Sequence, residues 1–217
     1  MQEAFPVTER TRVVREANRA VYDRETIYRI LDETFVCHVG FVADGQTYVI
    51  PTMFARVDDA LYFHGSAASR MLRGLSAGWP VCITVTLIDG LVLARSIFNH
   101  SMNYRSVVAL GQATLIDNPT EKLRALQSFA EKLIPGRWND ARQPNEKELK
   151  ATSILKLPLT HVSAKVRAGG VEDDAEDYNF PVWAGIVPLR LVAEAPVRDD
   201  RCDPTIPTPS YASNFKR

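Results

Sequence analysis

Residues 61–74, with the sequence LYFHGSAASRMLRG, combine the side chains that this chain could best use to bind an anion. The letters LYFH predict a strand that Gly65 would end, and Ser66 is a suitable N-cap for the helix that follows. This arrangement predicts that the backbone amides of residues 67–69 are unpaired at the positive end of the helix. Such an end can bind a phosphate dianion.

Three side chains of the same stretch would add further contacts to a phosphate. Ser66 and Ser69 offer hydroxyl groups, and Arg70 offers a charge-assisted hydrogen bond. The alternative interpretation is an ordinary strand-to-helix turn with a solvated arginine. A turn pattern this short does not by itself decide between the two interpretations.

The composition favours one globular domain and disfavours several classes of partner. The chain has 217 residues, of which 46% are hydrophobic, and its 26 basic residues balance 26 acidic ones. Because the net charge is zero, no overall field would attract nucleic acid or an anionic membrane. No apolar run is long enough to span a membrane, and residues 1–10 lack the apolar core of a signal peptide. We therefore expect a cytoplasmic protein.

The cysteines and histidines do not form a recognisable metal or disulfide motif. Cys37, Cys82 and Cys202 are widely spaced, and the first two lie among apolar strand residues. The four histidines are scattered without the spacing of a zinc site. His64 is the histidine of most interest, because it directly precedes the Gly/Ser turn. A structural role for its ring is the alternative.

The order of the elements predicts a mainly β fold. Asp23 should cap a short helix that plugs one end of the fold. Two hairpins are expected, FVCHVGFVA-DG-QTYVIPTMFARV and VCITVTLI-DG-LVLARSIF. Asn118 should begin a longer helix. Residues 137–150 should form a polar loop with a short helical turn, and residues 153–168 a further strand with Pro158 at an edge or bulge. Strands that arrive as hairpins indicate a closed antiparallel β-barrel with peripheral helices rather than a doubly wound α/β fold.

Three segments of different composition are expected along the chain. Residues 1–21 are polar and rich in arginine, and we interpret them as an arm that lies across a surface. Residues 22–194 should form the barrel domain. Residues 195–217 contain many prolines and polar residues, and we expect them to be extended or disordered.

An ordered succession of motifs resembles a known family. The segments HVGFVADGQTYVIPTMFARVDDALYFHGSAASRML, TVTLIDGLVLARS, NHSMNYRSVVALGQA and WAGIVPL are similar to flavin-binding split-barrel proteins related to pyridoxamine 5'-phosphate oxidase. The nitroimidazole-resistance branch is the most similar group. The resemblance covers residues 22–191 and implies a split β-barrel of the FMN-binding type, with FMN bound at the interface of a homodimer.

The resemblance also implies which residues contact the cofactor. It places the flavin ring against Val49, Ile50, Pro51 and Thr52, the phosphate at His64, Gly65, Ser66, Ser69 and Arg70, and the ribityl chain or ring edge at Thr84, Val85 and Thr86. Further contacts, including a second cation for the phosphate, would come from Tyr104, Arg105 and Ser106, and an aromatic contact across the dimer from Trp183. Simpler roles are available for several of these residues, which could be core residues, a surface ion pair (Arg105) or plain packing (Trp183).

The expected function follows from the cofactor. We expect an FMN-dependent oxidoreductase that acts on a small molecule, such as a nitro or quinone-like acceptor, with a nicotinamide donor; no side chain is assigned as catalytic. Oxidation of pyridoxamine phosphate itself is disfavoured, because TYVIPTMF replaces the arginine-rich strand motif of that enzyme and the chain end lacks its Arg/His segment. The alternatives are a flavin carrier or sensor without turnover, and a haem-binding split barrel with a histidine ligand.

Overall fold

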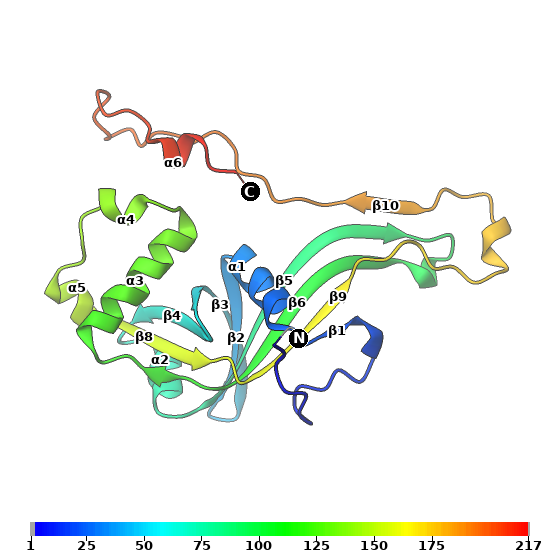
Figure 1. The fold of residues 1–217 in the computed structure, drawn as a ribbon, viewed down its shortest axis with the longest axis horizontal. Coiled ribbons are helices and arrows are strands. Elements are labelled where there is room, and N and C mark those ends of the chain that lie inside the picture. Colours follow the sequence, from blue (N-terminus) through cyan, green and yellow to red (C-terminus); the bar gives the residue numbers. More distant parts are fainter. Residues whose placement is uncertain (1–2, 217) are drawn as a thin grey trace.

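The structure is a computed structural model that describes residues 3–216. Strands dominate it, as the hairpin pattern predicted, and helices lie at the periphery (Figure 1). The strands are β1 (Ala20–Val21), β2 (Val36–Ala43), β3 (Gln46–Val57), β4 (Ala60–Ser66), β5 (Pro80–Leu93), β6 (Ser101–Gln112), β7 (Thr114–Leu115), β8 (Thr152–Pro158), β9 (His161–Arg167) and β10 (Gly185–Pro188). The helices are α1 (Arg24–Glu33), α2 (Arg70–Ser76), α3 (Pro119–Leu133), α4 (Arg137–Asp140), α5 (Glu146–Ala151) and α6 (Ser210–Ser213), with short 3-10 turns at Ala17–Arg19, Ile97–Asn99 and Asp177–Asn179.

All strands belong to one antiparallel sheet. Their order is β1-β9-β6-β5-β2-β3-β4-β8-β7, and β10 pairs with the end of β5. Within residues 3–216 this path ends at β1 and β7, which do not pair with each other. The strands therefore do not form a closed ring of hydrogen bonds. The prediction of a closed barrel was wrong, and the structure is a curled, open sheet. The prediction of an antiparallel split-barrel fold with peripheral helices is confirmed.

The curled sheet encloses one main apolar core. Alternate residues of the strands point inward, as in β2, where Cys37, Val39 and Phe41 are buried while their neighbours are more exposed. Helix α1 closes one end of this core, as predicted, with the side chain of Asp23 accepting a hydrogen bond from the amide of Thr26 at 3.0 Å. Helix α3 covers a smaller apolar cluster on the opposite face of β4 and β8.

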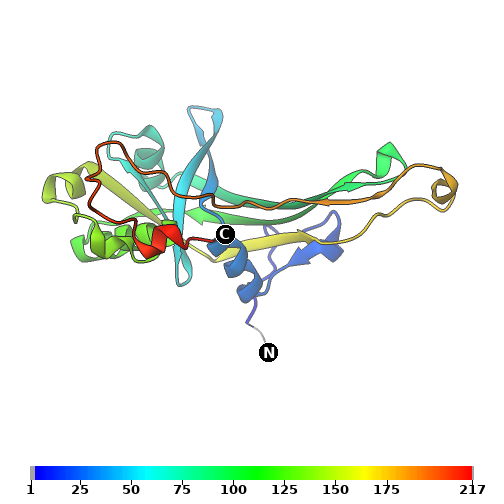
Figure 2. The ribbon, with the colours of Figure 1, turned by 90° about the horizontal axis from the view of Figure 1, so that it is seen from above.

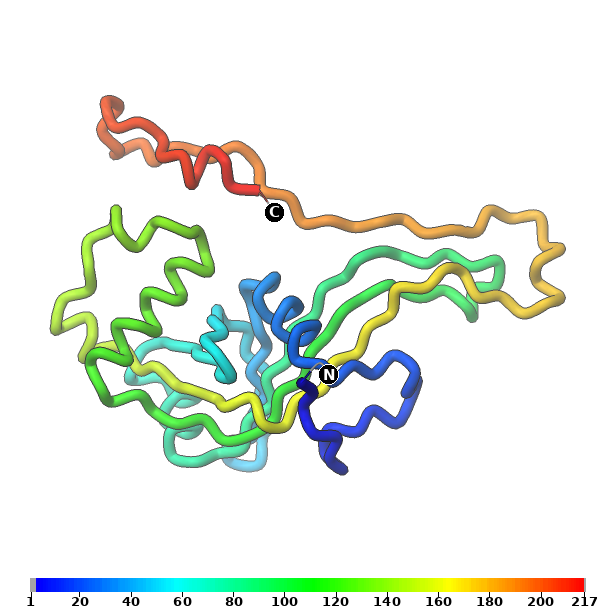
Figure 3. Tube along the Cα trace, viewed as in Figure 1, coloured from blue at the N-terminus to red at the C-terminus, as the bar shows by residue number. Residues whose placement is uncertain are grey.

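The two ends of the chain differ in how they contact the core. In the N-terminal segment, β1 pairs with β9 and Phe5 is buried at 2% exposure, so this segment contributes to the core as well as covering it. The C-terminal segment runs along the long β5–β6 hairpin and then returns over the sheet (Figures 2 and 3). Its last part lies near α3 and α4, where the Arg137 side chain donates a hydrogen bond to the Tyr211 hydroxyl at 3.0 Å.

Candidate functional site

The sheet splits between β3 and β4. β3 pairs with β2 along Gln46–Met53, whereas it pairs with β4 only along Phe54–Val57. From residue 64 onward β4 continues with β8 as its partner. Among the described residues, the part of β3 before residue 54 is therefore paired on one side only, and its other side presents backbone N–H and C=O groups that a planar, polar ligand could use.

The residues on this open part of β3 are unusually exposed for a strand inside a sheet. Val49 is 61% exposed and Ile50 is 36% exposed, while Thr52 is half-buried. Pro51 fits the open edge, because a proline has no N–H and is tolerated where a strand lacks a neighbour. These exposed β-branched side chains form an apolar surface that a ligand or a second molecule could contact.

The turn after β4 differs from its predicted geometry. The N-cap of α2 is Ser69 rather than Ser66, and its Oγ accepts a hydrogen bond from the amide of Leu72 at 3.5 Å. The amide of Ala67 donates to Ala151 O at 3.0 Å, that of Ala68 to Ser66 Oγ at 3.2 Å, and that of Ser69 to Ser66 O at 2.9 Å. The predicted set of unpaired amides was wrong, because the turn closes on itself and on the end of α5.

Side chains, rather than these amides, are what the turn can offer to an anion. The Arg70 guanidinium lies 4.3 Å from the centre of the Tyr48 ring, on the open part of β3, and that ring stacks on Phe41 at 5.4 Å. The side chain of Arg70 is exposed. Ser66 and Ser69 accept hydrogen bonds from backbone amides, so each hydroxyl still has a hydrogen to donate. A guanidinium and two hydroxyls thus lie next to the open edge.

His64 lies on the face that α3 covers. Its ring centre is 4.4 Å from that of Phe129, and its Nδ1 is buried without a hydrogen-bond partner. Burial lowers the pKa of His64 below its usual 6.5, so the neutral ring is favoured. The packing role that was the alternative for this histidine is therefore present in the structure.

A second group of predicted residues lies on the outer face of the sheet. The register pairs Thr84 with His38 and Val108, and Thr86 with Ser106. Alternation places Val85 on the opposite, inner face, where it is 1% exposed within the core. His38 was not predicted, although the alternation of FVCHVGFVA could have placed it on the same face as Val36.

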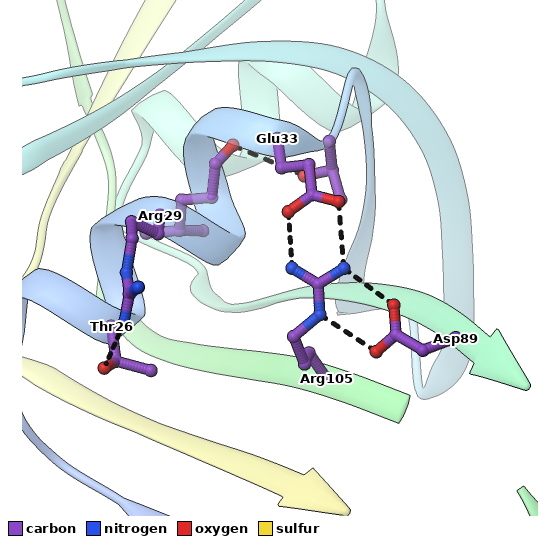
Figure 4. A network of polar contacts seen from close by, with 7 residues as sticks. Thr26, Arg29, Glu33, Asp89 and Arg105 are labelled. Atoms are coloured by element: carbon purple, nitrogen blue, oxygen red, sulfur yellow. Dashed lines mark hydrogen bonds and ion pairs between the residues drawn. The ribbon is translucent and has the colours of Figure 1, made fainter. Parts of the chain in front are cut away.

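Arg105 also points away from the outer face and is held by two carboxylates (Figure 4). Its Nε and Nη2 donate to Asp89 at 2.9 and 2.7 Å, and its Nη2 donates to Glu33 at 2.9 Å, with a further contact from Nη1 to Glu33. These hydrogen bonds raise the pKa of Arg105 further above its usual range. The network links the end of α1 to the β5–β6 hairpin, which is the ion-pair alternative to a phosphate contact.

Trp183 lies in the C-terminal segment two residues before β10, the strand that pairs with the end of β5. Its side chain is 65% exposed and folds over Gly185, where an added Cβ would come within 2.6 Å of the ring. The structure therefore places Arg70 of the turn beside β3, where it contacts Tyr48, whereas His64 faces α3. Three other predicted residues lie away from this turn within the chain. Val85 is in the core, Arg105 is paired with Glu33 and Asp89, and Trp183 precedes β10.

Within residues 3–216, no group of three or more His, Cys, Asp or Glu side chains is arranged to hold a metal ion. The helices of this region include none that is long and apolar enough to cross a membrane.

An open antiparallel sheet, split beside a Ser/Arg turn, defines the class of split-barrel proteins. The family model described as pyridoxamine 5'-phosphate oxidase matches residues 23–166, which is most of the chain, and the chain belongs to this family. A search of curated proteins finds no match.

Three solved structures illustrate the range of similarity. The flavocytochrome Anf3 from Azotobacter vinelandii is 43% identical with a TM-score of 0.91, and the match covers 96% of this chain and 97% of that one. The FAD and heme binding protein from Mycobacterium smegmatis is 34% identical with a TM-score of 0.88, over 91% and 97% of the two chains. A 5-nitroimidazole antibiotic resistance protein from Bacteroides thetaiotaomicron is 25% identical with a TM-score of 0.56, over 68% and 86%.

Proposed function

We propose that this chain is a redox protein that binds a flavin in the split between β3 and β4 and also binds haem. The observation that carries this proposal is the near full-length similarity to a flavocytochrome and to a protein named for FAD and heme, at 43% and 34% identity. The similarity to the nitroimidazole-resistance protein covers only 68% of the chain. The segments outside the family module are thus shared with the relatives that are named for both cofactors.

The split offers hydrogen-bond donors for a flavin phosphate and an open backbone edge for the flavin ring. Arg70 and the hydroxyls of Ser66 and Ser69 would donate hydrogen bonds to the phosphate next to the ribityl chain. The open backbone edge beside Val49 and Ile50 would face the polar rim of the ring, which carries alternating donors and acceptors. FMN is the flavin that the sequence resemblance implies, and FAD would present the same first phosphate to the turn.

A bound flavin supplies hydride or electron transfer, and the protein supplies orientation and hydrogen bonds. The residues of the split hold the cofactor and exclude water from one face of it. We propose an oxidoreductase that accepts electrons from a nicotinamide donor and passes them to a small acceptor, such as a nitro or quinone-like compound, with haem as a second electron carrier.

We also propose that the protein is a homodimer. Several apolar side chains of the outer sheet face are exposed to a degree that is unusual for central strands. They are Val36 at 48%, Val42 at 55%, Val49 at 61% and Ile88 at 47%. A second copy packed on this face would cover them and would close the open side of the flavin split.

An anaerobic reductive titration tests the redox role. The holoprotein is reduced stepwise with NADH or NADPH, and the flavin absorbance and the haem Soret band are recorded together. We expect the flavin to be bleached and the Soret band to shift as electrons reach the haem. A flavin that neither nucleotide reduces, combined with no turnover of any acceptor, would support a carrier or sensor instead.

A further inference from the structure

One stretch of the C-terminal segment is exposed along its whole length. We name residues 191–197, with the sequence LVAEAPV, the strap. Leu191 is 68% exposed, Val192 is 63% exposed and Val197 is 95% exposed. Within the part of the chain that the structure describes, no hydrogen bond joins the strap to another residue. Because all of its side chains except that of Glu194 are apolar, exposure to water is unfavourable for the strap.

The chain is fixed on both sides of the strap. Before it, β10 pairs with β5, and the amide of Leu189 donates to Asp89 O at 3.0 Å. After it, the Arg198 guanidinium donates to Ile206 O at 2.7 Å, and the hydroxyl of Tyr211 is bonded to α4. Seven extended residues can span about 25 Å. The strap crosses from the hairpin side to the α3–α4 end of the molecule (Figures 1 and 2), so it is a bridge held at both ends and not a free terminus.

The exposed area of the whole chain is large for its mass. The chain exposes 13758 Å², whereas a folded monomer of 24.3 kDa exposes about 10,000 Å². The excess of about 3,700 Å² is several times the roughly 800 Å² that each partner buries in an interface of standard size. The area is therefore sufficient for a permanent interface with a second copy of this chain.

The strap begins beside the sheet face that we propose as the dimer face. Ile88 belongs to that face and is 47% exposed. It lines a cavity of about 560 Å³ together with residues 188–191, which include Leu189 and Leu191. The apolar side chains of the sheet face and the start of the strap thus border the same hollow. A second copy that covers the sheet face would therefore reach the strap without a break.

We infer that the strap of each protomer lies on the second copy of this chain, so that the two copies hold each other by exchanged straps as well as by their sheet faces. The apolar side chains of the strap are then buried in the dimer, which accounts for their exposure in the single chain. Two-fold symmetry places two straps in the interface, one from each copy. This inference rests on the proposed homodimer and adds the segment that holds it together.

Substitutions in the strap of the full-length protein test this inference. Leu191→Asp and Val197→Asp each place a charge where the single chain is exposed, so the fold of each protomer should be unaffected. The dissociation constant of the dimer, measured by sedimentation velocity over a dilution series, should rise about 100-fold or more, because each substitution occurs twice in the symmetric interface. Val14→Asp is the matched control, since Val14 is 81% exposed in the N-terminal segment and gives the same change of charge. The control should dissociate like the wild type.

A photo-crosslink then shows which copy the strap contacts. The photoreactive amino acid benzoylphenylalanine replaces Val197, and the purified full-length protein is irradiated in its native state. We expect a crosslinked dimer on a denaturing gel. Mass spectrometry of mixed dimers, in which one copy carries ¹⁵N, should find the strap peptide of one copy joined to a peptide of the other.

The outcomes separate this inference from the proposed function. A wild-type protein that sediments as a monomer at every concentration removes the proposed homodimer together with this inference. A wild-type dimer that both strap substitutions leave intact, or a crosslink that stays within one copy, overturns the inference alone. Equal weakening of the dimer by Val14→Asp would show a general effect of added charge and would also overturn the role of the strap.

Discussion

Replacement of Arg70 by Ala is the sharpest test of the flavin split. Its guanidinium is exposed and stacks on Tyr48, beside the open edge of β3. If it donates a charged hydrogen bond to the flavin phosphate, its loss should cost about 1.5–3 kcal/mol of binding free energy. At 1.36 kcal/mol per factor of ten, the dissociation constant for flavin should rise about 10- to 150-fold.

The assay is a titration of apoprotein with FMN and, separately, with FAD, followed by quenching of flavin fluorescence. Arg73→Ala is the matched control, because Arg73 is also exposed, lies on the same helix and gives the same change of charge. Arg70→Lys keeps the charge and should recover part of the affinity. An Arg70→Ala variant that binds both flavins as tightly as the wild type would refute the phosphate contact and return Arg70 to a solvated, stacking role.

Three further predictions concern the scaffold. Arg105→Ala should lower the free energy of unfolding by about 1–2 kcal/mol, because both carboxylate partners of Arg105 are only partly exposed. Calorimetry should then show a fall in Tm of about 2–8 °C. An unchanged Tm would contradict the role of Arg105 as a bridge between α1 and the β5–β6 hairpin. Gly74→Ala should destabilise by about 1–3 kcal/mol in urea unfolding, since the new Cβ would lie 2.1 Å from the Trp79 ring. Because burial lowers the pKa of His64, the unfolded chain binds more protons than the folded chain at acid pH, and the free energy of unfolding should fall as the pH drops below about 6.5. In His64→Phe the free energy of unfolding should depend less on pH in this range. A pH profile identical to that of the wild type would contradict the role of His64.

The parts of the fold that depend on local sequence could be predicted well. Asp23 and Asn118 cap the helices that they were expected to cap, since a cap needs only the amides two or three residues further on. The Asp44-Gly45 turn forms with both residues at positive φ, as the hairpin pattern predicted. Alternation along β2 and β5 decides which side chains face the core.

The parts that depend on distant contacts could not be predicted in the same way. The amide of Ala67 bonds to Ala151, and Arg105 is paired with Glu33, and neither partner is near in sequence. The register between β3 and β4 decides where the sheet splits, and no local pattern gives that register. Phe5 lies in a polar segment, so its burial is a consequence of tertiary packing.

The candidate site residues also divide into those whose place depends on neighbouring elements and those whose place depends on distant contacts. The assignment of residues of β3 and of the turn after β4 to one cofactor site stays a prediction, and the contact of Arg70 with Tyr48 places the two elements side by side. Sequence reasoning did not identify Tyr48 under Arg70. For Tyr48 the signal was available, since it alternates with Ile50 and Thr52 along the strand.

Flavin and haem binding are tested first by the visible absorption spectrum of the freshly purified protein. The small molecules that heat or acid releases from the protein are then identified. We expect flavin bands and a Soret band in the same preparation, with FMN or FAD and haem released from it. A colourless protein that takes up neither added flavin nor added haem would contradict both flavin and haem binding, although its split-barrel fold would stand.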